Sequence, residues 1–370
     1  MNDYLKYYLA PLTQVAAIAG LVAGGHWVWV GIAWFPLMAL FDSLLPLDLS
    51  PRKMTNRALA FVPVWLSTLL GPAVYVALAW SVAHNDLTAA QIVGAVIGTA
   101  WMAVVPLVAS AHELYHARGK FGKFVGRYAQ VCFLDCTRME AHVVGHHIDV
   151  GTTRDSDTAE RGQTLYGFAP RAVWRSTIEA QRVVSDALEK RGYGRWSIRH
   201  ALWRAILAMV IFQAGLYAVG GWPAVAMALA AMILARVWVE TFNYFQHYGQ
   251  VRVIGAPIEK RHVWNHFAPL SRLLGFEITN HADHHLNSYL SYYALVPHRE
   301  SVRLPSMFVC FLAALVPPLW FNVIIKPALK EWDLGYANAE ERQLAAEQNR
   351  RAHWEDWLGA ASQPATAARA

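Results

Sequence analysis

Long apolar segments alternate with charged segments along this chain of 370 residues. A hydrocarbon core about 30 Å thick requires roughly 20 apolar residues in a helical crossing. Six segments are long and apolar enough to meet this requirement. They cover residues 8–24, 27–46, 59–82, 88–110, 202–219 and 223–245. The pattern therefore predicts an all-α integral membrane protein with six transmembrane helices.

The intervening segments are of mixed polarity. Residues 111–201 carry apolar positions at helical spacing between charges, which is typical of amphipathic helices that lie beneath a membrane bundle. Residues 246–337 follow the last predicted span, and two adjacent prolines interrupt their apolar stretch at 306–325. We expect a hairpin or interfacial segment there, because a seventh crossing would place the carboxyl terminus outside. Residues 338–370 are predicted to be an exposed helix followed by a flexible tail.

The distribution of Lys and Arg over the short loops predicts the orientation of the bundle. Arg52, Lys53 and Arg57 lie between the second and third spans, and residues 111–201 are rich in both types. The turns that contain neither type are residues 24–26, 84–86 and 219–221. We therefore expect both termini to face the cytosol, with residues 111–201 and 246–337 cytosolic and the bacterial inner membrane as the location.

The composition supports this class and excludes several others. A hydrophobic content of 55% and a mean hydropathy of +0.24 argue against soluble domains. The net charge of +6 does not indicate nucleic-acid binding, because the basic residues are not interleaved with aromatic residues on a polar segment. Cys132, Cys136 and Cys310 lack the spacing of a zinc or iron–sulfur site, and residues 119–126 lack that of a nucleotide loop. Flavin and nicotinamide would therefore bind another polypeptide.

Nine of the 16 histidines fall into four groups near the cytosolic ends of apolar segments. The groups are His112 and His116; His142, His146 and His147; His247; and His281, His284 and His285. Residues three or four apart share a helix face, so each larger group can direct its rings at one point. Burying nine polar side chains near the hydrocarbon core costs free energy unless a partner uses their lone pairs, so the groups indicate a metal site. Nine imidazoles are too many for one zinc ion and suit two ions. Imidazole alone does not distinguish iron, copper, zinc and nickel.

Other polar residues near these groups are candidates to accept hydrogen bonds from the ligand rings, or otherwise to serve only as loop acids and caps. These candidates are Glu113, Asp149, Asp155, Asp157, Asn243, His262, His266 and Asp283. The remaining histidines are expected to be interfacial residues without a metal. They are His26, His84, His200, His298 and His353.

Two unrelated functions share part of this pattern. The segment His112-Glu113-x-x-His116 also matches intramembrane zinc proteases, in which the glutamate is the general base. That reading leaves seven clustered histidines without a role. A non-enzymatic metal transporter is a further alternative, although its ligands are expected halfway across the bilayer, whereas these lie at one end.

The spacing within three groups reads His112-x-x-x-His116, His142-x-x-x-His146-His147 and His281-x-x-His284-His285. It resembles the histidine boxes of the membrane-bound fatty acid desaturase and hydroxylase superfamily. The segment 243–249 around His247 resembles the additional box of integral-membrane alkane hydroxylases. Nearly the whole chain is similar to the hydroxylases of the xylene-type (toluene side-chain) monooxygenases. Ala141 and Gln246 replace the glutamates of the alkane enzymes, as they do in the xylene-type branch.

The resemblance implies a non-haem diiron monooxygenase that hydroxylates benzylic methyl groups of toluene- or xylene-like hydrocarbons. It implies that the nine grouped histidines bind two iron ions in a helical cap on the cytosolic side. The co-substrate would be O2, with electrons from NADH through a separate reductase carrying FAD and a [2Fe–2S] centre. Terminal hydroxylation of medium-chain alkanes is the alternative, and an acyl-lipid desaturase is a more distant one.

The physical chemistry of such a substrate agrees with a membrane site. A small arene gains about 25 cal/mol per Å² of apolar surface on leaving water, so it concentrates in the bilayer and needs no charged anchor. Trp34 and Phe35 are candidates to bound its pocket, although either could instead face lipid or pack between helices. The basic cytosolic face suits an acidic redox partner.

Overall fold

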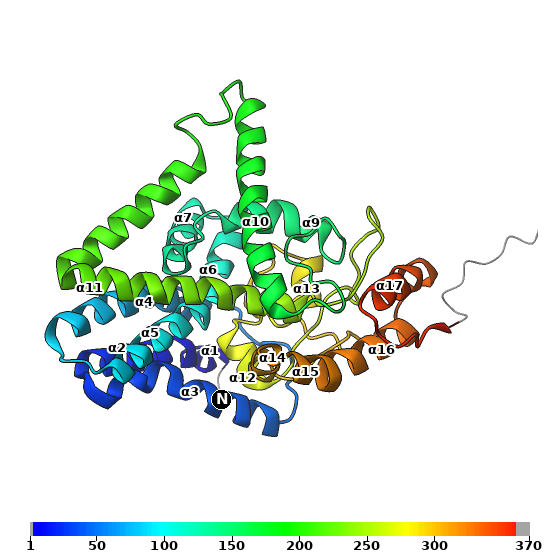
Figure 1. Cartoon of the computed structure of the whole chain (residues 1–370), viewed down its shortest axis with the longest axis horizontal. Helices are drawn as coiled ribbons and strands as arrows, with labels where there is room; N and C mark the ends of the chain where they lie inside the picture. Colours follow the sequence, from blue (N-terminus) through cyan, green and yellow to red (C-terminus); the bar gives the residue numbers. More distant parts are fainter. Residues whose placement is uncertain (1–2, 360–370) are drawn as a thin grey trace, which may run out of the picture.

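The computed structural model describes residues 3–359, and within this range the chain is helical, with two isolated β-bridges and no strands (Figure 1). This confirms the all-helical class. The helices of the apolar bundle are α1 (Asp3–Lys6), α2 (Leu9–Ala23), α3 (Val30–Leu44), α4 (Arg57–His84), α5 (Ala89–Val104), α6 (Leu107–His116) and α11 (Ala201–Gln246).

Within the described residues, five helical segments, some of them made of two successive helices, are long and apolar enough to cross a membrane. They are Asp3–Ala23, Gly25–Leu44, Arg57–His84, Ala89–His116 and Ala201–Gln246. The last has 46 residues and leaves helical geometry at Gly220 and Gly221, so that α11 has two arms that meet at an angle (Figure 1). These arms match the two predicted spans at 202–219 and 223–245. The count of six crossings and their orientation remain predictions.

Glycines permit the sharp bend in α11. Gly221 has a φ of 65°, in the left-handed region that residues with a Cβ rarely adopt. A Cβ on Gly220 would lie 2.4 Å from the carbonyl oxygen of Ala79 in α4. The close approach of the α11 bend to α4 therefore depends on the absence of a side chain at this position.

Proline ends α5 just before the first pair of grouped histidines. The residue before a proline is disfavoured in helical geometry, and Val105 is extended, with a φ of −125° and a ψ of 113°. The chain resumes as α6, which carries His112 and His116. The apolar run 88–110, predicted as one span, is therefore two helices in sequence, and the second one is buried along most of its length.

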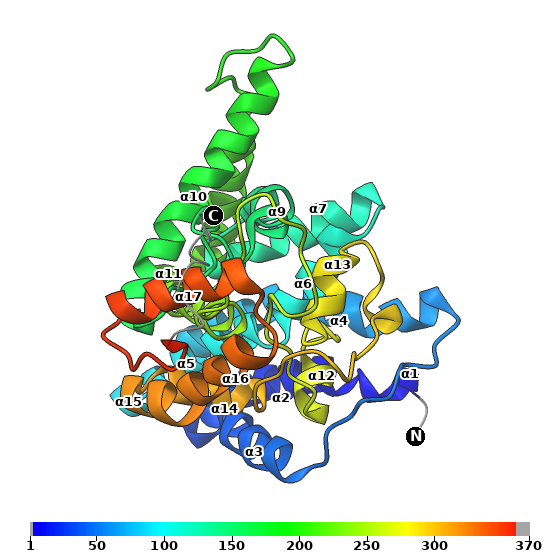
Figure 2. The same ribbon diagram turned by 90° about the vertical axis from the view of Figure 1, so that its right-hand side faces the viewer.

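The remaining helices surround the bundle, and most of them lie on the side away from the bend in α11 (Figures 1 and 2). They are α7 (Lys120–Ala129), α8 (Arg138–Glu140), α9 (His147–Asp149), α10 (Leu165–Glu189), α12 (Pro269–Leu274), α13 (His281–Leu286), α14 (Met307–Ala314), α15 (Pro317–Leu319), α16 (Lys326–Gly335) and α17 (Ala339–Arg351). Helix α10 projects from the body in both views. The stretch 306–325 is divided among α14, α15 and a π-helical turn rather than forming one long helix.

Helix α17 is packed more closely than an exposed helix would be. Its Glu341 is 1% exposed and accepts hydrogen bonds from Arg261 and, at 2.7 Å, from Nε2 of His262. One face of α17 is therefore buried, whereas the sequence predicted an exposed helix. The ionic contact of Glu341 holds this face in place, and the spacing of residues along the sequence does not reveal it. Residues 360–370, the end of the predicted tail, lie outside the described residues.

Candidate metal centre

The nine grouped histidines come from four parts of the chain and lie together inside the helical cap. They are carried by α6, by the π-helical turn Ala141–His146 with α9, by the residue that follows α11, and by α13. Eight of the nine are buried and His147 is half-buried. The structure therefore brings together all nine residues that the sequence predicted as ligands.

The second histidine group lies on a π-helical turn that the sequence did not indicate. A π-helix pairs residues five apart, so positions four and five residues along the chain both lie about one turn away. His146 and His147 accordingly both lie near His142, with ring centroids at 5.0 and 4.7 Å. This wider turn allows one segment to contribute to two groups of ligands.

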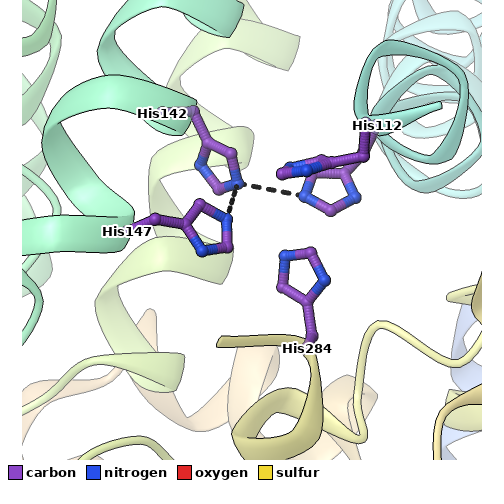
Figure 3. A group of neighbouring side chains, drawn as sticks. His112, His142, His147 and His284 are labelled. Carbon is purple, nitrogen blue, oxygen red and sulfur yellow. Dashed lines mark hydrogen bonds between the residues drawn. The ribbon is translucent and has the colours of Figure 1, made fainter. Parts of the chain in front are cut away.

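Five histidines form a first convergent group, which consists of His112, His116, His142, His147 and His284. One ring nitrogen from each lies within 4.8 Å of the others. Nε2 of His142 lies 3.0 Å from Nε2 of His112 and 3.2 Å from Nε2 of His147 (Figure 3). Both ring nitrogens of His116 and Nε2 of His284 are buried without a hydrogen-bond partner among the described residues. Buried lone pairs converging in this way fit a shared cation.

The other four histidines form a second group. Ring nitrogens of His146, His247 and His285 lie within 4.8 Å of one another. Nε2 of His281 lies 3.0 Å from Nε2 of His247 and 3.3 Å from Nε2 of His285. Nε2 of His146 is buried without a hydrogen-bond partner in the described part of the chain. The nine histidines thus separate into sets of five and four, which suits two metal ions.

Burial keeps most of these rings in the neutral form that a metal requires. It lowers the pKa of His281 to about 3 and holds the pKa values of His247, His284 and His285 well below their ordinary range. His146 is the exception: burial opposes its charge, but the carboxylate of Asp155 outweighs that effect and raises the pKa of the ring.

Asp155 is the predicted supporting acid that contacts a grouped histidine directly. Its two carboxylate oxygens lie 3.1 and 3.0 Å from Nδ1 of His146, and it also accepts a hydrogen bond of 2.6 Å from the hydroxyl of Thr158. A carboxylate at Nδ1 fixes the tautomer that leaves Nε2 free for a metal. Asp157 lies nearby, with a carboxylate oxygen within 4.8 Å of ring nitrogens of His142 and His146.

The other acidic candidates bond elsewhere. Glu113 accepts the backbone N–H of Tyr292 at 3.1 Å, and Asp283 accepts from the backbone of Val296 at 2.8 Å. Asp149 is half-buried, and within the described residues its carboxylate forms no hydrogen bond or salt bridge with a grouped histidine. These residues support loops rather than ligand rings.

The amide and imidazole candidates also have partners away from the centre. Asn243 donates to Glu240 at 2.8 Å, and His262 pairs with Glu341 of α17. Nδ1 of His266 lies 2.6 Å from the carbonyl oxygen of Pro305. His262 and His266 are therefore not part of either convergent group.

An apolar cavity of about 60 Å³ adjoins the two histidine groups. His112, His142, His247 and His281 line one part of it. The rest of its wall is largely apolar and includes Val104, Val105, Val108, Ala109, Phe242, Leu274, Ile278 and Met307. The cavity therefore places an apolar wall directly beside the ring cluster.

The two aromatic residues predicted to bound a pocket lie elsewhere. Trp34 is 39% exposed on the surface of the bundle. Phe35 is buried, but it packs on Trp101 and Phe311 with ring centroids at 4.2 and 5.4 Å and does not line the cavity. Residues of α5, α6, α11, α12 and α14 form its wall instead.

A buried ionic cluster beside the cavity was not predicted. Arg138 lines the cavity and donates to Glu240 at 2.6 Å and to Asp135 at 2.8 Å. Arg236 lies 3.2 Å from Asp135 and also pairs with Glu240. The signal was present in the sequence, because Arg236 and Glu240 stand four residues apart within an apolar span, where ionisable groups are rare and usually paired.

The position of the first histidine pair depends on close packing between α6 and α7. A Cβ on Gly126 would lie 2.6 Å from the carbonyl oxygen of Ala111 and 3.0 Å from the backbone nitrogen of Tyr115. Gly126→Ala is therefore expected to separate these helices and to destabilise the fold by about 1–3 kcal/mol. Thermal unfolding of the purified protein measures the loss. Gly119→Ala is the control, because no atom lies within 4 Å of its Cβ position, and equal stability of the two variants contradicts the prediction.

The amino-acid sequence of this chain is similar to those of known proteins in one family. Residues 87–305 match the fatty acid desaturase family. The hydroxylase component of xylene/toluene monooxygenase from Pseudomonas putida is 38% identical over 96% of this chain and 97% of that protein. Alkane 1-monooxygenase 2 from Alcanivorax borkumensis is 26% identical, covering 87% and 89%, and alkane 1-monooxygenase 1 from Pseudomonas aeruginosa is 30% identical, covering 79% and 76%.

Proposed function

This chain belongs to the fatty acid desaturase family and is a membrane oxidoreductase of the hydrocarbon monooxygenase type. We propose that it hydroxylates benzylic methyl groups of toluene- and xylene-like arenes. The observation that carries the proposal is the convergence of nine histidines beside an apolar cavity. The 38% identity to the xylene/toluene hydroxylase component supports the aromatic substrate class.

The donor set fits two iron ions. His112, His116, His142, His147 and His284 would hold one ion, and His146, His247, His281 and His285 would hold the other. Several of these nitrogens are buried and have no other partner within the described residues, a costly arrangement unless a cation uses their lone pairs. When bound, such ions supply the reduction of O2 that a monooxygenase requires.

The surrounding residues bind and orient the hydrocarbon. The apolar wall removes an arene from water and lipid without requiring a polar group on the substrate. Because His112, His142, His247 and His281 line the same cavity, a methyl group placed there points toward the ring cluster. Val108, Leu274 and other apolar side chains limit access of water to the centre.

The remaining parts of the proposal concern electrons and location. No nucleotide-binding motif is found in the chain, so we propose that NADH delivers electrons through a separate reductase with FAD and a [2Fe–2S] centre. We further propose that both termini and the histidine cap face the cytosol, since Lys and Arg are concentrated in that part of the chain.

Terminal hydroxylation of medium-chain alkanes is the second candidate, because the alkane 1-monooxygenases are also similar over most of the chain. The higher identity to the xylene/toluene hydroxylase component, 38% against 26% and 30% to the two alkane 1-monooxygenases, favours the aromatic substrate. Supplying toluene, p-cymene and octane to the iron-loaded protein with a reductase separates the two functions. Benzyl-type alcohols are the expected products, whereas 1-octanol alone would overturn the aromatic assignment in favour of alkanes.

Cavity size is expected to set substrate preference. Ala109 lines the cavity, and Ala109→Leu adds three carbon atoms to the wall. We expect oxidation of m-xylene to fall about tenfold more than that of toluene, since crowding costs on the order of 1–3 kcal/mol for the larger ring. The ratio of kcat/KM for the two arenes measures the effect. Ala90→Leu, on an exposed position of α5, is the matched control, and an unchanged ratio in Ala109→Leu contradicts the role of this wall.

A further inference from the structure

Helix α7 lies at the edge of the molecule in Figure 2 and begins directly after the short link that follows His116. Its 10 residues form three parallel sides, each made of positions three and four apart. The buried side consists of Gly122, Gly126 and Ala129, the aromatic side of Phe121, Phe124 and Tyr128, and the basic side of Lys120, Lys123 and Arg127. The glycine side packs on α6, which leaves the aromatic and basic sides toward the surface.

The aromatic side of α7 continues an exposed apolar wall of α4. Phe121 and Phe124 are 70% and 59% exposed, although both side chains are large and apolar. Phe121 stacks on Trp65 of α4, with ring centroids 5.6 Å apart. Leu66 and Leu69, which follow Trp65 along α4, are exposed as well. In a membrane protein, a contiguous apolar surface of this kind is expected to contact acyl chains.

The length of α4 places this surface near a boundary of the membrane. Trp65 lies 19 positions before His84, the last residue of α4. A helix rises about 1.5 Å per residue, so the two residues are roughly 28 Å apart along its axis. This distance is close to the hydrocarbon thickness of about 30 Å. With the turn after His84 at one boundary of the hydrocarbon, Trp65 and Phe121 lie near the other.

The basic residues beside this surface are largely uncompensated. Residues 117–130 contain four basic side chains and no acidic one. Arg127 forms a salt bridge with Glu140. Arg118 and Lys120 are exposed and Lys123 is half-buried, and the side chains of these three form no salt bridge or hydrogen bond within the described residues. Three unpaired cations therefore lie next to exposed aromatic rings at the membrane boundary.

We infer that Arg118, Lys120 and Lys123 bind the phosphate of an anionic phospholipid whose acyl chains contact Phe121 and Phe124. Long basic side chains extend toward headgroups while neighbouring aromatic rings lie deeper, which is the arrangement that α7 presents. The headgroup supplies the negative charge that residues 117–130 lack. The site does not depend on the proposed reaction, because it uses none of the grouped histidines. Since α7 packs on α6, a lipid bound here also supports the helix that carries the first histidine pair.

Native mass spectrometry of the full-length, iron-loaded protein in a neutral detergent tests the inference. Kd is measured separately for dioleoylphosphatidylglycerol, which is anionic, and for dioleoylphosphatidylcholine, which has no net charge. We expect the first phosphatidylglycerol to bind at least about tenfold more tightly than the first phosphatidylcholine. Arg118→Gln with Lys120→Gln should raise the Kd for phosphatidylglycerol at least about tenfold and leave that for phosphatidylcholine within about twofold.

The matched control removes the same charge from another exposed helix. Arg350 and Arg351 of α17 pair with Glu347, and Arg350→Gln with Arg351→Gln should leave the Kd for phosphatidylglycerol within about twofold. Exchange of the two cations, Arg118→Lys with Lys120→Arg, retains the charge and should retain the preference for phosphatidylglycerol. Glycerol 3-phosphate, a phosphate ester without acyl chains, should not displace the lipid at equal concentration.

Three results would overturn the site. The wild-type protein could bind the two lipids equally, or the Arg118→Gln, Lys120→Gln variant could bind phosphatidylglycerol as tightly as the wild-type protein does. Equal losses in this variant and in the α17 control would assign the effect to net charge rather than to α7. Displacement by glycerol 3-phosphate would show that a soluble phosphate ester, and not a phospholipid, is the ligand.

Discussion

His284→Ala is expected to lower arene hydroxylation at least about a thousandfold, because it removes a donor from the group of five and leaves the other rings without a complete site. Nε2 of His284 is buried without a hydrogen-bond partner among the described residues, so no local contact compensates for its loss. We also expect iron content to fall from about two ions per chain to one or fewer. Metal analysis and product formation measure the two effects.

His26→Ala is the control for this experiment. His26 is exposed in the 3-10 helical turn Gly25–Trp29 between α2 and α3 and belongs to neither convergent group. The His26→Ala variant should retain both iron and activity. A His284→Ala protein that is folded, retains about two irons and turns over normally would refute the assignment of the first group as a metal site.

Asp155→Asn is expected to lower hydroxylation by about 10- to 100-fold. The substitution preserves the shape of the side chain but removes the carboxylate that accepts from Nδ1 of His146. The ring then loses the partner that fixes its tautomer and its orientation toward the second group. We expect weaker iron binding at one of two positions, detected as a change in the Mössbauer spectrum.

Asp149→Asn is the matched control for Asp155→Asn. Asp149 lies in the same segment and is half-buried, but its carboxylate forms no hydrogen bond or salt bridge with a grouped histidine in the described residues. Activity close to that of the wild-type protein is expected. Equal losses in the two variants would mean that the charge of the segment matters, rather than the specific contact with His146.

Local patterns allowed a large part of this protein to be predicted. Burial of apolar surface depends on the length and composition of each segment, so the apolar runs were found without knowledge of the fold. The histidine groups could be recognised because residues three to five apart stay close in any helix. The family and the hydrocarbon monooxygenase class followed from the same residues, and the comparisons confirm both.

The supporting residues were harder to predict because their roles depend on distant partners. Asp149, Asp155 and Asp157 were equivalent candidates in the sequence, yet only Asp155 forms a hydrogen bond with a grouped histidine in the described residues. Trp34 and Phe35 were chosen for their size, but α3, which carries them, contributes no residue to the wall of the cavity.

The amino-acid sequence by itself determined that apolar helices and clustered imidazoles occur in this chain, since both depend on local spacing and on the cost of exposing or burying each side chain. Only the tertiary structure decided which rings meet. His146 lies beside His247, with ring centroids 4.4 Å apart, although 101 positions separate them in the sequence. Contacts between distant segments determine the division into five and four rings, the π-helical turn and the packing of α17 against the cap. Such contacts depend on the packing of the whole chain, which no single segment encodes.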